Sequence, residues 1–326
     1  MYVGDAGNNR VAVIGLDGSV STLAASPASI YYSSVKQSPQ SAGQFADPFL
    51  PSGVAFSPSN SALVVSNAAP SGAGFLASVS PGGSPSALLG QASNVALLPK
   101  AFTPGLVSVD AASGALLVVD TAANTVYRLP SARSSAGFSL VATTATAPSL
   151  AKAVFASAVA DAAGHVIVAD RSGGITGAGV FNLTSGTSLF SGTLTAPTSL
   201  ALDASAGLLV ANGSCVFSLC PPRYDVINVV GCGLPFPAAG VAADSTGSVY
   251  AVSGNQVVKF FFSLDCTATT PPPTASSSLA MPPGASAPPP PPPGVSAPPA
   301  QQASTVSLTI TLGTRDTVLC DTPSLA

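Results

Sequence analysis

Residues 2–18 read YVGDAGNNRVAVIGLDG, in which a short run of strand-forming residues ends on Asp5 and a turn of Gly and Asn follows. A second apolar run then returns, and Asp17-Gly18 closes the unit. Val, Ile and Tyr favour strands, whereas Gly, Asn and Asp favour the tight turns that join antiparallel strands. The stretch therefore predicts strand, turn, strand, turn, and looser forms of this unit recur over residues 1–265.

Each later copy pairs two apolar runs across a turn that usually contains Gly. The first runs end at Ser57, Asp110, Asp161, Asp203 and Asp244, and the second runs end at Asn67, Asp120, Asp170, Asn212 and Ser253. Asp5 ends the second run of the first copy, which has no first run. The later copies repeat every roughly 40 to 50 residues, a period typical of a β-propeller whose blades are small antiparallel sheets. We predict an all-β propeller of about six four-stranded blades, the first of them incomplete.

The composition supports this fold class and excludes others. The 13 acidic residues are all Asp, and 31 Gly and 31 Pro leave little material for long amphipathic helices. Mean hydropathy is high, at +0.50, but Asp, Gly, Ser or Pro interrupts every apolar run before it reaches the length of a membrane span. Net charge is -3 and the ten Lys and Arg are scattered, so a nucleic-acid-binding surface is not expected.

Proline placement agrees with a ring of blades. Pro51, Pro104, Pro197 and Pro237 each stand just before the first strand of a copy, where a missing N–H costs least. Propellers commonly complete a blade that lacks its innermost strand from the other end of the chain. No such strand is evident after Phe262, so we expect an open seam between the first and last blades.

The composition changes abruptly at Cys266. We divide the chain into a propeller over residues 1–265, a disordered Pro/Ser/Ala-rich linker over 266–303, and a segment over 304–326. That last segment is either a short strand that returns to the propeller or the start of a second module. The linker contains six consecutive prolines, Pro288, Pro289, Pro290, Pro291, Pro292 and Pro293.

Several residues are candidates for covalent chemistry outside a reducing compartment. The cysteines suit disulfides better than zinc, because no Cys-x-x-Cys pair exists and His165 is the single histidine. The disulfide candidates are Cys215, Cys220, Cys232 and Cys266, with a hairpin bridge between Cys215 and Cys220 as one possibility. Asn182 and Asn212 begin glycosylation sequons. His165 follows a turn glycine, which favours a solvated histidine over a catalytic base.

Recurring carboxylates offer one metal hypothesis. Asp5, Asp120 and Asp170 occupy equivalent positions and in a ring could hold calcium. The structural alternative, which we favour, is that each side chain accepts hydrogen bonds from the N–H groups of a turn. We therefore expect no cofactor, with calcium as the exception to test.

The stretch Tyr2 to Val11 resembles the NHL repeat, and residues 104–128 resemble a fuller but degenerate copy. The resemblance covers about residues 1–262 and implies a propeller in which Asn9 and Arg10 bond within the blade. The Pro-rich spacer resembles those of plant and green-algal hydroxyproline-rich glycoproteins. Together they imply a non-enzymatic scaffold that binds a protein or glycan, extracellular or wall-associated.

Two alternatives remain. One is a degenerate metal-dependent hydrolase similar to gluconolactonase or strictosidine synthase propellers, although those families rely on a Glu that this chain lacks. The other is a cytosolic scaffold that recruits polyproline-binding domains.

Overall fold

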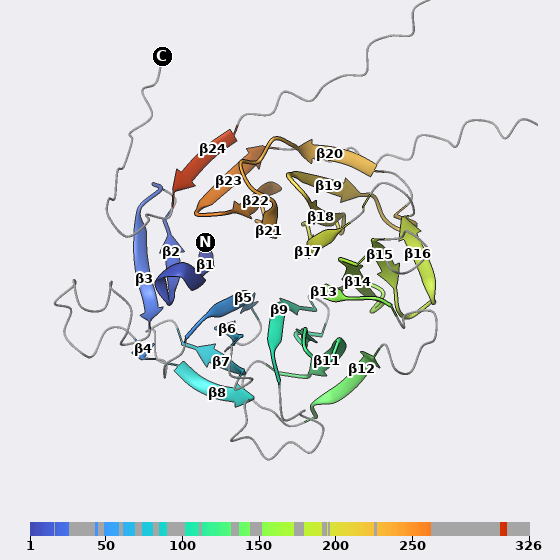
Figure 1. The fold of residues 1–326 in the computed structure, drawn as a ribbon, viewed down its shortest axis with the longest axis horizontal. Helices are drawn as coiled ribbons and strands as arrows, with labels where there is room; N and C mark the ends of the chain where they lie inside the picture. The colour runs from blue at the N-terminus through green and yellow to red at the C-terminus, as the bar shows by residue number, and fades with distance from the viewer. Residues whose placement is uncertain are drawn as a thin grey trace, which may run out of the picture.

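The computed structural model describes residues 1–15, 17–25, 43–44, 49–58, 61–68, 74–80, 85–89, 102–110, 113–131, 137–143, 152–172, 179–190, 194, 196–224, 227–261 and 307–311. These residues form six four-stranded sheets arranged as blades around a central axis (Figure 1). Apart from a short 3₁₀ helix, η1 (Ala6–Asn8), the described elements are all strands. The predicted six-bladed all-β propeller is therefore confirmed.

The blades follow one another in chain order. Blade 1 contains β1 (Tyr2–Asp5), β2 (Arg10–Ile14), β3 (Val20–Ala25) and β4 (Gly43–Gln44). Blade 2 contains β5 (Pro51–Ser57), β6 (Ala62–Asn67), β7 (Phe75–Val79) and β8 (Pro85–Leu89). Blade 3 contains β9 (Pro104–Val109), β10 (Leu116–Asp120), β11 (Thr125–Leu129) and β12 (Ser139–Thr143). Blade 4 contains β13 (Phe155–Ala160), β14 (Val166–Asp170), β15 (Val180–Asn182) and β16 (Thr187–Phe190). Blade 5 contains β17 (Pro197–Leu202), β18 (Leu208–Asn212), β19 (Cys215–Leu219) and β20 (Ile227–Gly231). Blade 6 contains β21 (Ala238–Ala243), β22 (Ser248–Ser253), β23 (Gln256–Phe261) and β24 (Ser307–Thr311).

Burial between blades accounts for the high hydropathy. Neighbouring blades cover both faces of the second strands, and every residue of β6, β10 and β14 is buried. Strands covered on both faces are continuously apolar, with no alternation of polar and apolar residues. The described residues include no helix with the length and hydrophobicity of a membrane span.

Hydroxyl groups link the innermost strands of successive blades. The pairs are Ser52 Oγ to the Pro104 carbonyl at 2.7 Å, Ser108 Oγ to the Ala158 carbonyl at 2.7 Å, the Leu200 N–H to Ser157 Oγ at 3.2 Å, and the Val241 N–H to Ser199 Oγ at 3.2 Å. Each bond satisfies a backbone group at the crowded centre of the ring, where a buried unpaired group would be costly. Serine on a first strand therefore fixes the spacing between blades.

The hairpin turns between first and second strands follow the predicted Asp-to-Gly pattern with one difference. Gly114 and Gly164 have positive φ values of 71° and 82°, as expected of a turn glycine. In blade 5 the residue with positive φ is Ala206, at 64°, and not Gly207. A side chain at Gly207 would lie 2.5 Å from Asp203 Oδ2, so this glycine is required by the close approach of the carboxylate.

Blade 1 is built differently from the others. Its first antiparallel strand, β1, ends on Asp5 and corresponds to the second strands of the other blades, and its fourth strand, β4, runs parallel to β3. Near the other end of the sequence, β24 pairs antiparallel with β23 at the outer edge of blade 6. Blades 6 and 1 still touch through the buried side chains of Val3, Ile14 and Val257.

Candidate functional site

A cavity of about 180 Å³ occupies the centre of the ring. The innermost strands of the blades line it, together with β1 and parts of β22 and β23. Ser52, Ser157 and Ser199 contribute hydroxyl groups, and Tyr2 and Tyr250 contribute phenol rings. Most of the remaining lining is Val, Leu, Ala and Gly.

Most polar side chains of this lining are already engaged. Ser157 and Ser199 accept hydrogen bonds from the next blade, and the Tyr250 hydroxyl donates to Asp244 at 2.9 Å. Among the lining residues that the structure describes, none is Asp, His, Lys or Arg. An apolar cavity with few polar groups suits the binding of a ligand.

The recurring residues that end the second strands act as anchors for the segments that lead into their own blades. In each case the side chain accepts a backbone N–H from the segment that leads into the first strand of the same blade. The pairs are Asn67 with Leu50, Asp120 with Thr103 at 3.3 Å, Asp170 with Val154 at 2.8 Å, Asn212 with Ala196 at 3.0 Å and Ser253 with Phe236 at 3.0 Å. Asp, Asn and Ser all perform the same task, so the task requires an acceptor oxygen and not a charge.

Asp120 illustrates the physical environment of these anchors. Its Oδ1 accepts N–H groups from Thr103, Ala122 and Ala123, while Oδ2 is buried and accepts nothing from the described residues. Burial raises the pKa of the Asp120 carboxyl above its ordinary 3.8, although the three N–H donors oppose the shift. The Oδ2 of Asp170 is likewise buried and unpartnered within the described part of the chain.

Asp5 has a different partner from the other anchors. Its Oδ2 accepts a hydrogen bond from the Arg10 guanidinium at 2.8 Å, and both side chains are buried. Asn8 donates to the same carboxylate at 2.9 Å, and Arg10 also donates to Thr22 at 3.1 Å. This network holds the β1–β2 turn, in which Asn9 adopts a left-handed conformation with φ of 53°.

A second set of aspartates holds the turns between first and second strands. Asp161 Oδ1 accepts the N–H groups of Ala163 and His165, each at 2.9 Å. His165 lies in this turn, and its Nδ1 is 3.0 Å from Asp161 Oδ2. In blade 6, burial of Asp244 favours the neutral acid, but hydrogen bonds from Thr246, Tyr250 and Ser248 prevail and lower its pKa to about 2.

The three metal candidates do not converge. Asp5, Asp120 and Asp170 end strands of blades 1, 3 and 4, and each carboxylate accepts hydrogen bonds within its own blade. Over the residues that the structure describes, no group of three or more His, Cys, Asp or Glu side chains is placed to hold a metal ion. Calcium prefers six to eight oxygen ligands, which one isolated carboxylate does not supply.

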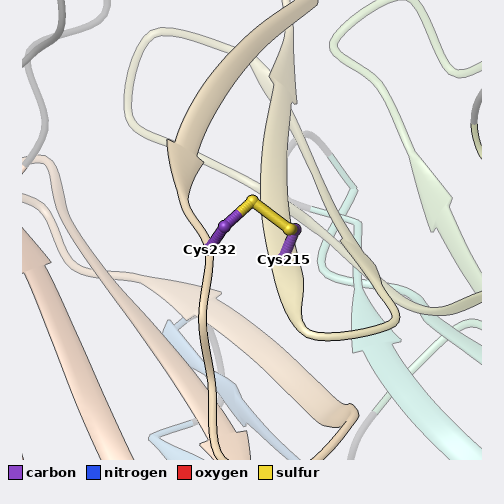
Figure 2. The surroundings of a disulfide bond; sticks show 2 residues. All are labelled: Cys215 and Cys232. Carbon is purple, nitrogen blue, oxygen red and sulfur yellow. A yellow bond between two sulfur atoms is a disulfide. The ribbon is translucent and has the colours of Figure 1, made fainter.

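The cysteines give one correction. Cys215 bonds Cys232, with an S–S distance of 2.00 Å, so the hairpin bridge between Cys215 and Cys220 is wrong (Figure 2). The bond joins the start of β19 to the segment just after β20, which are neighbours at one end of blade 5. Cys220 is also disulfide-bonded, while Cys266 and Cys320 lie outside the described residues.

The sequons lie at strand ends. Asn182 is 7% exposed, and its Oδ1 accepts the N–H groups of Thr184 and Ser185. Asn212 is the anchor of blade 5 described above. Glycosylation of either residue stays a prediction. The predicted linker prolines 288–293 lie outside the described residues.

Serine pairing between blades and the Cys215–Cys232 bond were not predicted from the sequence. Ser52, Ser157 and Ser199 each stand one or two residues after the start of a first strand, which is a signal that alignment of the copies would have shown. The disulfide had no comparable signal, because its pairing depends on which strands of one blade lie together.

No protein-family model matches the chain, and no curated protein matches it. Among solved structures, a catalytically inactive virginiamycin B lyase from Staphylococcus aureus, crystallised with quinupristin, superposes with a TM-score of 0.51 at 13% identity. The match covers 77% of this chain and 73% of that one. A streptogramin B lyase structure gives a TM-score of 0.46 at 13% identity. The match covers 64% of this chain and 64% of that one.

A gluconolactonase from Xanthomonas campestris gives a TM-score of 0.47 at 14% identity, over 64% of this chain and 71% of that one. At these identities the likeness extends to the fold alone. The six sheets and the superposition agree that the chain is a β-propeller.

Proposed function

We propose that this protein is a non-enzymatic binding scaffold, a propeller with NHL-like repeats that presents its inter-strand segments to a protein or glycan partner. The observation that carries the proposal is the chemistry of the central cavity. Its described lining is apolar or hydroxyl-bearing, and the recurring aspartates hold turns and blade connections. A propeller core that uses its carboxylates for structure leaves recognition to the outer segments.

An extracellular or wall-associated location goes with this proposal. The Cys215–Cys232 disulfide supports it, because disulfides persist in oxidising compartments. Expression with its native secretion route, followed by N-glycosidase treatment, tests the location. A mobility shift that disappears in the Asn182→Gln and Asn212→Gln variants supports it, whereas free thiols at Cys215 and Cys232 in the isolated protein contradict it.

A metal-dependent hydrolase is the second candidate, and the unpartnered Oδ2 atoms of Asp120 and Asp170 favour it. Thermal melting in the presence of Ca²⁺ or Zn²⁺ separates the two functions. An ion at a concentration of 100 Kd would stabilise the fold by about 2.7 kcal/mol, which corresponds to a melting shift of roughly 4 to 5 °C for a propeller of this size.

The binding-scaffold proposal predicts no such shift at 1 mM of either ion. The matched variant is Asp120→Asn with Asp170→Asn, which removes two carboxylates and keeps their Oδ1 acceptors. A shift of several degrees in the wild type that is lost in this variant would contradict the scaffold proposal and support the hydrolase.

Recognition itself is measured on arrays of immobilised glycans and extended peptides. Dose-dependent, saturable binding that survives EDTA supports the scaffold. Turnover of a lactone or ester by the same preparation, abolished by EDTA, opposes it.

A further inference from the structure

The innermost strand position of blade 1 is vacant among the described residues. In blades 2 to 6 the strand that ends on the anchor residue pairs on both sides, but β1 pairs only with β2. Met1 and Ile14 exchange two backbone hydrogen bonds, each of 2.8 Å. Because hydrogen-bonded pairs alternate along antiparallel strands, the N–H and C=O groups of Tyr2 and Gly4 face away from β2, toward the vacant position.

Side-chain burial shows the same vacancy. Tyr2 is 37% exposed, whereas the residues at its position in blades 3, 4 and 5, Leu117, Ile167 and Leu209, are at most 1% exposed. The apolar cluster between blades 6 and 1 has three buried members among the described residues, Val3, Ile14 and Val257. Each of the other clusters between blades has at least seven.

First strands supply what this cluster lacks. In blades 3 to 6 the first strand contributes two apolar residues to the cluster with the preceding blade. They lie three and one residues before its closing Asp, as Val107 and Val109 do in blade 3. Leu200 and Leu202 do the same in blade 5. The central cavity also reaches this position, because Met1, Val3, Tyr250 and Val252 line it. A strand alongside β1 would fill that part of the cavity.

The C-terminal residues of the chain carry the matching sequence. Residues 317–321 read TVLCD, which places Val318 and Cys320 three and one residues before Asp321. Thr317 falls at the position of Ser157 and Ser199, whose hydroxyls accept an N–H from the next blade. The sequence of this segment therefore matches the first strands in three features: the closing Asp, the two apolar residues and the hydroxyl.

The path of the chain permits the connection. β24 ends at Thr311 on the outer edge of blade 6, which lies beside blade 1 (Figure 1). From Thr311 to Thr317 the chain extends about 20 Å at most. This length exceeds the width of one blade, whose outermost and innermost strands are about 14 Å apart.

We infer that residues 315–321 dock antiparallel to β1 as the innermost strand of blade 1 and close the ring. The register of blades 3 and 5, in which Val107 pairs with Val118 and Leu200 with Val210, assigns the pairs. By this register Val318 lies opposite Val3, Leu319 opposite Tyr2, and Thr317 opposite Gly4. The Thr317 hydroxyl then accepts the N–H of Val54, as Ser199 accepts that of Val241. The inference is independent of the proposed function.

Disulfide trapping in the full chain tests the register. Val3 and Val318 form a non-hydrogen-bonded pair, in which Cα atoms are about 4.5 Å apart and within the range that a disulfide bridges. In a Cys320→Ser background, Val3→Cys with Val318→Cys is expected to form an intramolecular disulfide, with an intact mass lower by two hydrogen atoms and a linked peptide on digestion. The matched control is Val3→Cys with Leu319→Cys, whose side chains point to opposite faces and should stay alkylatable.

Each other result overturns the inference: no bond in either variant, equal bonding in both, or a bond between two chains. Hydrogen exchange gives a second measurement that needs no new cysteine. The amides of Tyr2 and Gly4 are expected to be protected in the wild type and to lose that protection in Val318→Asp but not in Ser324→Asp. Unprotected amides in the wild type would also refute the closure.

Discussion

The anchor Asp120 gives the sharpest test of how the blades are held. Replacing it with Ala removes one acceptor from three N–H groups, those of Thr103 at 3.3 Å, Ala122 at 3.0 Å and Ala123 at 3.1 Å. A buried N–H left without a partner costs about 1 to 3 kcal/mol, and the two turn amides can reach water in part. We expect Asp120→Ala to lower the free energy of unfolding by about 2 to 4 kcal/mol and the melting temperature by roughly 3 to 7 °C.

Asp120→Asn should behave differently, because Asn keeps Oδ1 and carries no charge. Blades 2 and 5 use Asn67 and Asn212 for the same bond. We expect a change within about 1 kcal/mol at pH 7, measured by urea unfolding, with the exposed turn variant Asp17→Asn as a control for charge removal.

The free energy of unfolding of the wild type and of Asp120→Asn should depend differently on pH. Since the pKa of Asp120 is raised in the fold, the folded chain binds the proton more tightly than the unfolded chain does. The free energy of unfolding of the wild type therefore falls as the pH rises from about 3.8 through the pKa that Asp120 has in the folded chain. In Asp120→Asn this fall should be absent, because Asn does not titrate. If Asn costs as much as Ala at pH 7, the carboxylate charge itself is required, and the structural role of the anchors is refuted in favour of an ion.

Three further predictions concern other parts of the ring. Arg10→Met should lower the unfolding free energy by about 3 to 5 kcal/mol, because it leaves the buried Asp5 carboxylate without its cation. Cys232→Ser opens a loop that spans 17 residues from Cys215, and the lost chain constraint predicts about 3 kcal/mol of destabilisation in chemical denaturation. Asp244, with its pKa lowered to about 2, should contribute stability above about pH 4 that is lost as pH falls toward 2, measured by its NMR titration and by melting.

Each of these has an outcome that contradicts it. Unchanged stability of Arg10→Met with Asp5 still ionised would show that the pair is not buried in solution. Reduction of the wild type without a fall in melting temperature would remove the constraint assigned to Cys215–Cys232. An Asp244 titration near 3.8 would mean that its hydrogen bonds are absent in solution.

The sequence determined the repeat and therefore the fold. Asp110 and Gly114, and likewise Asp161 and Gly164, are local signals, because a turn is specified by residues within a few positions of one another. The absence of Glu and the runs of Val, Ala and Leu decided against helices. Strands that are covered on both faces show no alternation of polar and apolar residues, so these continuous apolar runs also indicated which strands are fully buried.

Only the tertiary structure decided which chemistry those residues perform. That Asp120 accepts the N–H of Thr103 depends on how the chain re-enters its own blade, and that Cys215 meets Cys232 depends on which strand ends are neighbours. The residue type alone does not show whether an Asp carboxylate binds an ion or accepts a backbone N–H. The distinction is made by groups 17 residues away in the sequence, which the pairing of strands within one blade brings within bonding distance.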